Sequence, residues 1–107
     1  ALWVSNHGGR QFSACPSSIE VLPMIRETAG PDVPIIFDSG VRSGTDILRA
    51  IALGADFAML GRTWHWGVAA LGEPGAAHVT EMLRDSMICD MCQMAITRPA
   101  DVRTRLV

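Results

Sequence analysis

Three short apolar runs, separated by stretches with helical patterning, constrain the fold of this chain most strongly. The runs are Ala1–Val4, Val33–Phe37 and Asp56–Leu60, and each has the length and composition of a buried strand. Strands that are apolar throughout and alternate with helices are typical of a parallel sheet covered on both faces. The pattern therefore predicts an α/β fold in the order βα, βα, β, α, α.

Capping signals set the expected limits of the helices. Ser17 followed by Glu20 forms a capping box, and Ser43 or Thr45 is expected to cap the next helix. Pro23 falls inside the first helix and predicts a kink or a later start of its regular part. These signals predict helices that end near residues 29 and 53, then helices over residues 64–71, 76–94 and 99–106.

Composition limits the class of protein. The chain has 107 residues, of which 49% are hydrophobic and 19% charged, so we expect one domain at most, with a buried core. The net charge is −2 and all nine basic residues are scattered arginines, which argues against a nucleic-acid partner. No apolar run approaches the roughly 20 residues that span a bilayer.

The three cysteines are expected to be free thiols. Their number is odd and no secretory signal opens the chain, so a reducing, cytoplasmic location is expected. Cys89 and Cys92 have C-x-x-C spacing, but a zinc site needs two further ligands at similar spacing, and none follow. The sequence therefore predicts reduced cysteines in a helix and no metal.

Chemically active side chains follow each strand directly. They are His7 and Arg10 after the first strand, Asp38 and Arg42 after the second, and Gly61 and Arg62 after the third. In α/β folds the carboxyl ends of the strands form the edge where ligands bind. We therefore expect the three clusters to meet in one site.

The second and third clusters suit a phosphate group. Glycine lets backbone N–H groups approach an anion closely, while arginine adds a bidentate charged fork. The helix that begins near Thr45 would contribute its positive end. Surface salt bridges and ordinary turns are the alternative for Arg42 and Arg62. Asp38 could accept hydrogen bonds from ligand hydroxyls or cap local backbone.

The first cluster suits an anionic substrate beside a larger cofactor. His7 can act as a general base near neutral pH, and Arg10 can hold a carboxylate through two parallel hydrogen bonds. A lone histidine after a strand is nevertheless more often structural than catalytic. His65 and His78 lack a comparable context, and we expect them to be structural or solvated.

The motifs SNHGGRQ, DSGVRSGTD and ALGADFAMLGR, in this order and spacing, resemble a known family. The family is that of the FMN-dependent α-hydroxy-acid oxidases and dehydrogenases, which include glycolate oxidase, lactate oxidase, L-lactate dehydrogenase and mandelate dehydrogenase. The motifs resemble the C-terminal part of these proteins. The resemblance runs from Val4 to about Leu83. It implies an α/β (β/α)8 TIM barrel, of which residues 1–107 would supply strands six to eight as a partial domain of a longer chain.

The resemblance also implies roles. His7 matches the catalytic base and Arg10 the residue that grips the substrate carboxylate. The residues matching the FMN-binding segments are Asp38, Ser39, Gly40, Val41 and Arg42, followed by Gly61 and Arg62. The implied reaction oxidises a small, L-lactate-like 2-hydroxy acid to a 2-oxo acid. A homo-oligomer is expected for the full-length protein, and a membrane-associated form would depend on an insertion outside this segment.

The sequence departs from the family in several places. Ser39 stands where many members have glycine, and Phe12-Ser13 replaces the usual Leu-Asp. The lysine and tyrosines that the family uses are absent, so we expect the isolated chain to be inactive. Trp64 and Trp66 are expected to cover the barrel end rather than line the pocket rim. The alternatives are another FMN- or phosphate-binding barrel, such as type 2 isopentenyl-diphosphate isomerase or inosine-monophosphate dehydrogenase, and a non-catalytic barrel remnant.

Overall fold

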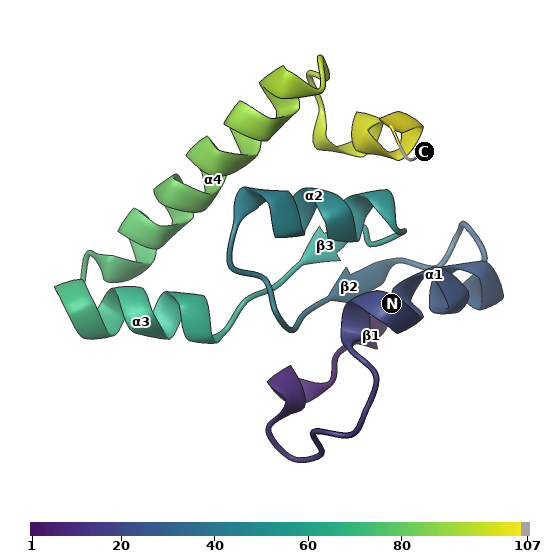
Figure 1. The fold of residues 1–107 in the computed structure, drawn as a ribbon, viewed down its shortest axis with the longest axis horizontal. Coiled ribbons are helices and arrows are strands. Elements are labelled where there is room, and N and C mark those ends of the chain that lie inside the picture. Colours follow the sequence, from purple (N-terminus) through teal and green to yellow (C-terminus); the bar gives the residue numbers. More distant parts are fainter. Residues whose placement is uncertain (106–107) are drawn as a thin grey trace.

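A computed structural model describes residues 1–105 as three parallel strands connected by helices (Figure 1). The strands lie in the order β1-β2-β3, and both neighbouring pairs are parallel. Their bounds are Leu2–Val4 for β1, Ile35–Phe37 for β2 and Phe57–Ala58 for β3. Helix α1 (Ser18–Ala29) connects β1 to β2, and α2 (Gly44–Ala52) connects β2 to β3. The predicted βα repeats are confirmed.

The strands are shorter than predicted. Strand β2 was predicted from Val33 but begins two residues later, at Ile35. The backbone hydrogen bonds between β2 and β3 nevertheless extend one residue beyond each end of β3. The N–H of Asp56 donates to the Ile35 carbonyl at 2.9 Å, and the N–H of Met59 donates to the Phe37 carbonyl at 2.8 Å.

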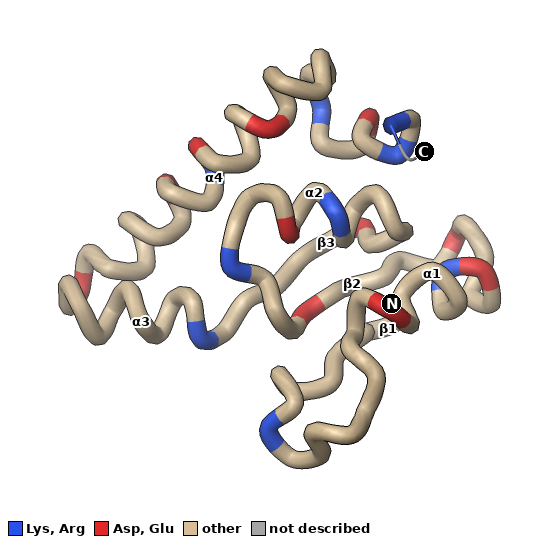
Figure 2. The backbone as a smooth tube through the Cα atoms, viewed as in Figure 1, with Lys and Arg blue, Asp and Glu red and all other residues tan. Residues whose placement is uncertain are grey.

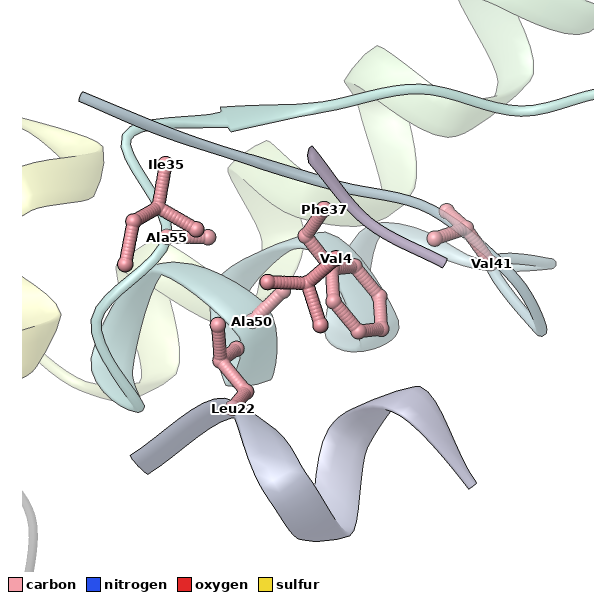
Figure 3. Packing of buried hydrophobic residues seen from close by; sticks show 7 residues of the cluster. All are labelled: Val4, Leu22, Ile35, Phe37, Val41, Ala50 and Ala55. Atoms are coloured by element: carbon pink, nitrogen blue, oxygen red, sulfur yellow. The ribbon is translucent and has the colours of Figure 1, made fainter. Parts of the chain in front are cut away.

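The main core lies on one face of the sheet, between the strands and helices α1 and α2 (Figure 3). It consists of Val4, Leu22, Ile35, Phe37, Val41, Ala50 and Ala55. We expected helices on both faces. Among residues 1–105, the opposite face instead exposes Trp3 and Phe57, at 60% and 62% of their surface. Side chains alternate along a strand, and the register places these two in one row with Ile36.

The C-terminal third adds a second layer of helices. Helix α3 (Arg62–Leu71) packs against α4 (Gly75–Gln93), and α4 in turn crosses α2 (Figure 1). The short helix predicted over residues 99–106 is the 3₁₀ helix η2 (Pro99–Arg105), and Leu106 lies outside the described residues. A smaller core joins α2, α4 and η2 through Leu48, Met91, Ile96 and Val102.

The capping predictions are confirmed in detail. The Glu20 carboxylate accepts hydrogen bonds from the backbone N–H and the hydroxyl of Ser17, at 2.8 and 2.7 Å. Ser43 caps α2: its hydroxyl accepts from the N–H of Asp46 at 3.2 Å, while the Asp46 carboxylate accepts from the Ser43 N–H at 3.1 Å. Helix α1 starts directly after its cap and runs through Pro23, so the expected later start is wrong.

Charge is distributed over the whole molecule. Figure 2 shows acidic and basic residues interspersed along the elements rather than gathered on one of them. One cluster is structural: the Asp56 carboxylate pairs with Arg26 of α1 at 2.5 Å and with Arg103 of η2 at 3.2 Å. Across residues 1–105, no helix combines the length and the apolar character needed to cross a membrane.

Candidate active site

A cavity of about 240 Å³ opens at the carboxyl ends of the three strands. Its wall is built from the loops after β1, β2 and β3 and from the first turns of α3. All nine site residues predicted from the sequence line it, namely His7, Arg10, Asp38, Ser39, Gly40, Val41, Arg42, Gly61 and Arg62. The structure thus brings together three clusters that are up to 55 positions apart in the sequence.

The loop after β1 has an unusual backbone. His7, Gly8 and Gly9 form a single 3₁₀ turn, and their φ angles of +55°, +66° and +71° all fall in the left-handed region. A Cβ atom at Gly8 would lie 2.5 Å from the guanidinium of Arg62, which donates to the Gly8 carbonyl at 3.2 Å. Glycine therefore suits the left-handed backbone at this position, and any larger residue would also displace the Arg62 guanidinium. The loop leaves the side chains of His7 and Arg10 exposed at the cavity.

The Asp38 carboxylate is surrounded by side-chain donors. Its Oδ1 accepts from the hydroxyls of Ser5 and Ser39, both at 2.6 Å, and its Oδ2 accepts from the Trp3 indole at 3.2 Å. Its backbone N–H donates to the Val4 carbonyl at 3.0 Å. Of the two roles considered for Asp38, its side chain therefore does not cap local backbone. The Oδ2 atom keeps acceptor capacity for a ligand hydroxyl.

A second set of residues in the cavity lining suits a phosphate group. Arg42 and Arg62 approach it from two different loops, and α3 begins at Arg62, so the positive end of the helix adjoins the cavity. A Cβ atom at Gly40 or Gly61 would meet nothing within 4 Å, so a ligand can approach the backbone at both positions. These donors fit the phosphate of a nucleotide-type cofactor. The volume is below the roughly 300–1,000 Å³ of complete ligand pockets, so it suits part of such a cofactor.

Two further residues of α3 belong to the site and were not predicted. Trp66 lines the cavity, so the expectation that it only covers the barrel end is wrong. The Thr63 hydroxyl donates to the Val41 carbonyl at 2.8 Å and ties α3 to the loop after β2. Trp66 follows Arg62 by four positions, which places both on one face of a helix. The spacing of Arg62 and Trp66 could have indicated that Trp66 belongs to the site. The inference would have required a helix that begins at Arg62, whereas the sequence predicted one that begins at Trp64.

The other histidines and the cysteines lie outside the cavity lining. His65 and His78 lie in α3 and α4 and do not line it. Cys15, Cys89 and Cys92 are free and exposed. Within the described residues, no group of three or more histidine, cysteine or acidic side chains is placed to hold a metal ion.

The fold and cavity define an α/β domain whose cavity, at the carboxyl edge of a parallel sheet, suits an anionic ligand. Comparison with known proteins makes the assignment specific. The family model described as FMN-dependent dehydrogenase matches residues 1–107. The chain belongs to this family, whose cofactor is FMN.

Individual relatives agree with this assignment. A 2-hydroxyacid oxidase of Dictyostelium discoideum is 41% identical over 104 residues, covering 97% of this chain and 27% of the relative. A pre-mycofactocin synthase of Mycolicibacterium smegmatis is 44% identical over 84 residues, covering 78% and 21%. The crystal structure of a Pediococcus acidilactici protein described as a lactate oxidase superposes with a TM-score of 0.90 at 42% identity, covering 95% and 28%. The chain spans about a quarter of the length of these proteins.

Proposed function

We propose that this chain carries the FMN-phosphate site and the catalytic side chains of an enzyme that oxidises a 2-hydroxy acid, with L-lactate or a close analogue as substrate, to the 2-oxo acid. One observation carries the proposal: a single cavity is lined both by a base with an arginine, His7 and Arg10, and by two further arginines, Arg42 and Arg62. The first pair suits a carboxylate substrate, and the second suits the cofactor phosphate.

The chain would form strands six to eight of a (β/α)8 barrel within a longer polypeptide. Supporting this placement, β1, β2 and β3 are consecutive parallel strands joined by helices that cover one face. The site lies at the carboxyl ends of the strands, where barrel enzymes place their active sites. The apolar row on the opposite face would then become part of the barrel interior.

The cofactor would be held by backbone and arginine donors. Gly40 and Gly61 leave their backbones accessible, and Arg42 and Arg62 would neutralise the phosphate. The free acceptor capacity of Asp38 would serve a ribityl hydroxyl. Bound FMN supplies the acceptor for a hydride equivalent, that is, two electrons and one proton.

His7 and Arg10 would act on the substrate. Arg10 would orient the carboxylate, so that the carbon bearing the hydroxyl faces the imidazole of His7. Oxidation removes one proton and one hydride equivalent from the CH–OH unit and leaves a carbonyl. His7 would accept the proton and, because its side chain is exposed, return it to solvent. Whether that proton leaves carbon or oxygen stays open. The roles that lysine and tyrosine have in the family would fall to the rest of the barrel.

Family membership leaves the substrate open, because the relatives include both a 2-hydroxyacid oxidase and a pre-mycofactocin synthase. The alternatives remain another FMN- or phosphate-binding barrel and a non-catalytic barrel remnant. The pairing of His7 with Arg10 in one cavity favours a small carboxylate substrate.

Replacing the base tests the proposal. In the full chain loaded with FMN, we expect His7→Gln to lower kcat with L-lactate by about 10²–10⁴-fold, while the flavin absorbance spectrum is retained. His78→Gln on exposed α4 is the matched control and should leave turnover unchanged. Undiminished turnover in His7→Gln would favour another class of FMN barrel. A chain that binds FMN but oxidises no 2-hydroxy acid would favour the non-catalytic remnant.

A further inference from the structure

The Ser39 hydroxyl links the loop after β2 to the loop that carries His7. Its Oγ donates to Asp38 Oδ1 at 2.6 Å. The same atom accepts from the backbone N–H of Gly8 at 3.2 Å and, at a longer 3.4 Å, from that of Asn6. These two N–H groups lie on either side of His7 in the chain. The hydroxyl therefore contacts the backbone immediately before and after the proposed base.

A few other hydrogen bonds hold the loop after β1. The Gly9 N–H donates to the Asn6 carbonyl at 3.0 Å, which is a local bond. The His7 N–H donates to the Ser5 hydroxyl at 3.1 Å, and that hydroxyl in turn donates to Asp38 Oδ1 at 2.6 Å. Arg62 adds one bond, to the Gly8 carbonyl. A turn with three successive left-handed residues is not favoured on its own, because His7 is not glycine. Its position thus depends on contacts with neighbouring loops.

Ser39 occupies a conformation that suits glycine better than serine. Its φ angle is +87°, in the left-handed region that non-glycine residues rarely adopt. A glycine would adopt this backbone without strain but would provide no hydroxyl. Strained residues that persist in a site point to a role for the side chain. The role visible here is the set of bonds made by Oγ.

We propose that Ser39 is a positioning residue for His7, with Asp38 fixing the direction of its hydroxyl. A serine hydroxyl has one proton and two lone pairs. Because the proton is directed to Asp38, the lone pairs are free to accept from Gly8 and Asn6. The Asp38 carboxylate therefore fixes the position of the His7 loop through the Ser39 hydroxyl. The inference rests on the proposed role of His7 as the base.

Ser39→Gly separates this role from a merely structural one, because glycine relieves the backbone strain while the hydroxymethyl group that makes the hydrogen bonds is removed. In the FMN-free full chain, we expect the amide protons of Asn6 and Gly8 to exchange at least about tenfold faster, without a lower Tm. In the FMN-loaded chain, kcat with L-lactate should fall by about 10- to 100-fold, as expected for a base displaced by about 1 Å. Saturating FMN keeps any change in cofactor affinity out of the measured kcat.

Ser13→Gly is the matched control: it makes the same chemical change at an exposed position of the same loop, outside the cavity. It should alter neither exchange at Asn6 and Gly8 nor kcat. Unchanged exchange in Ser39→Gly would overturn the proposal, and so would faster exchange with an unchanged kcat. In the second case, His7→Gln shows which inference failed. Full activity in that variant refutes the base assignment, whereas lost activity refutes only the positioning role.

Discussion

At the scale of single residues, Arg42 and Arg62 show how two loops build one anion site. They are 20 positions apart in the sequence, yet both line the cavity, and each follows a glycine-containing strand end. Hydrogen bonds to charged groups contribute about 1.5–3 kcal/mol each, and solvent exposure reduces this. We therefore expect Arg42→Ala or Arg62→Ala to weaken FMN binding about tenfold, as measured by quenching of flavin fluorescence during a titration.

The control is Arg84→Ala, on the exposed surface of α4, where the arginine pairs only with Glu81 among the described residues. This variant should bind FMN like the wild type. Equal affinities for all three variants would show that the phosphate does not lie between Arg42 and Arg62. The double variant should lose saturable binding, since the remaining donors are neutral backbone groups.

The site residues were predictable because a general rule of parallel sheets brings strand ends together. His7, Arg42 and Arg62 each follow an apolar run directly, so their convergence needed no knowledge of distances. The partners of Asp38 were not predictable. They depend on the strand register, which places Trp3 and Ser5 beside it, and on the left-handed backbone of Ser39.

At the scale of elements, local signals predicted the helices better than the strands. The Ser17 and Ser43 caps need only contacts within one turn, and both form as expected. Strand ends depend on which partner residues reach the ladder, and β2 begins only at Ile35, where Leu2 is its partner. The short 3₁₀ helix η2 depends on tertiary contacts, above all on Arg103, which bonds to the carbonyls of Ile51 and Ala55.

Asp56 joins several elements at the edge where the strands begin, opposite the site. Burial acts to raise the pKa of Asp56. Hydrogen bonds from the Ile35 N–H, Arg103 and Arg26 outweigh it, so the pKa of this carboxyl lies below its ordinary value. A lowered folded-state pKa means that the carboxylate stabilises the fold above its unfolded pKa of about 3.9. This contribution is lost as the pH falls through the folded-state pKa.

We therefore expect Asp56→Asn to lower the free energy of unfolding by about 1 kcal/mol at pH 7, a figure reduced because the side chain is 43% exposed. The difference from the wild type in the free energy of unfolding should narrow at pH 3, which lies below the unfolded-state pKa of about 3.9, because the unfolded chain then binds a proton that the lowered folded-state pKa disfavours. Urea unfolding of the full chain at both pH values measures it. Asp85→Asn on exposed α4 provides the control. If Asp56→Asn lowered the free energy of unfolding equally at both pH values, stability would not depend on the ionisation of Asp56.

At the scale of the whole molecule, the helices cover only one face of the sheet, and the core lies on that face. Trp3 and Phe57 are more than half exposed on the other face, and β1 and β3 each leave one edge unpaired within residues 1–105. The parallel βα order was predictable from the apolar runs. The open face was not predictable, because a strand that is apolar throughout has the same sequence pattern whether helices or further strands cover its second face.

These open surfaces predict how the 107-residue chain behaves alone. Unpaired strand edges and a contiguous apolar face favour association with other chains. We expect the isolated chain to be unstable or to self-associate in sedimentation velocity runs, increasingly so at higher concentration. Adding the N-terminal barrel segment of the Dictyostelium discoideum relative as a separate chain should shift it towards a defined complex, because the missing strands would pair with β1 and β3. A monodisperse, fully active monomer without any added segment would contradict both the barrel placement and the need for partner strands.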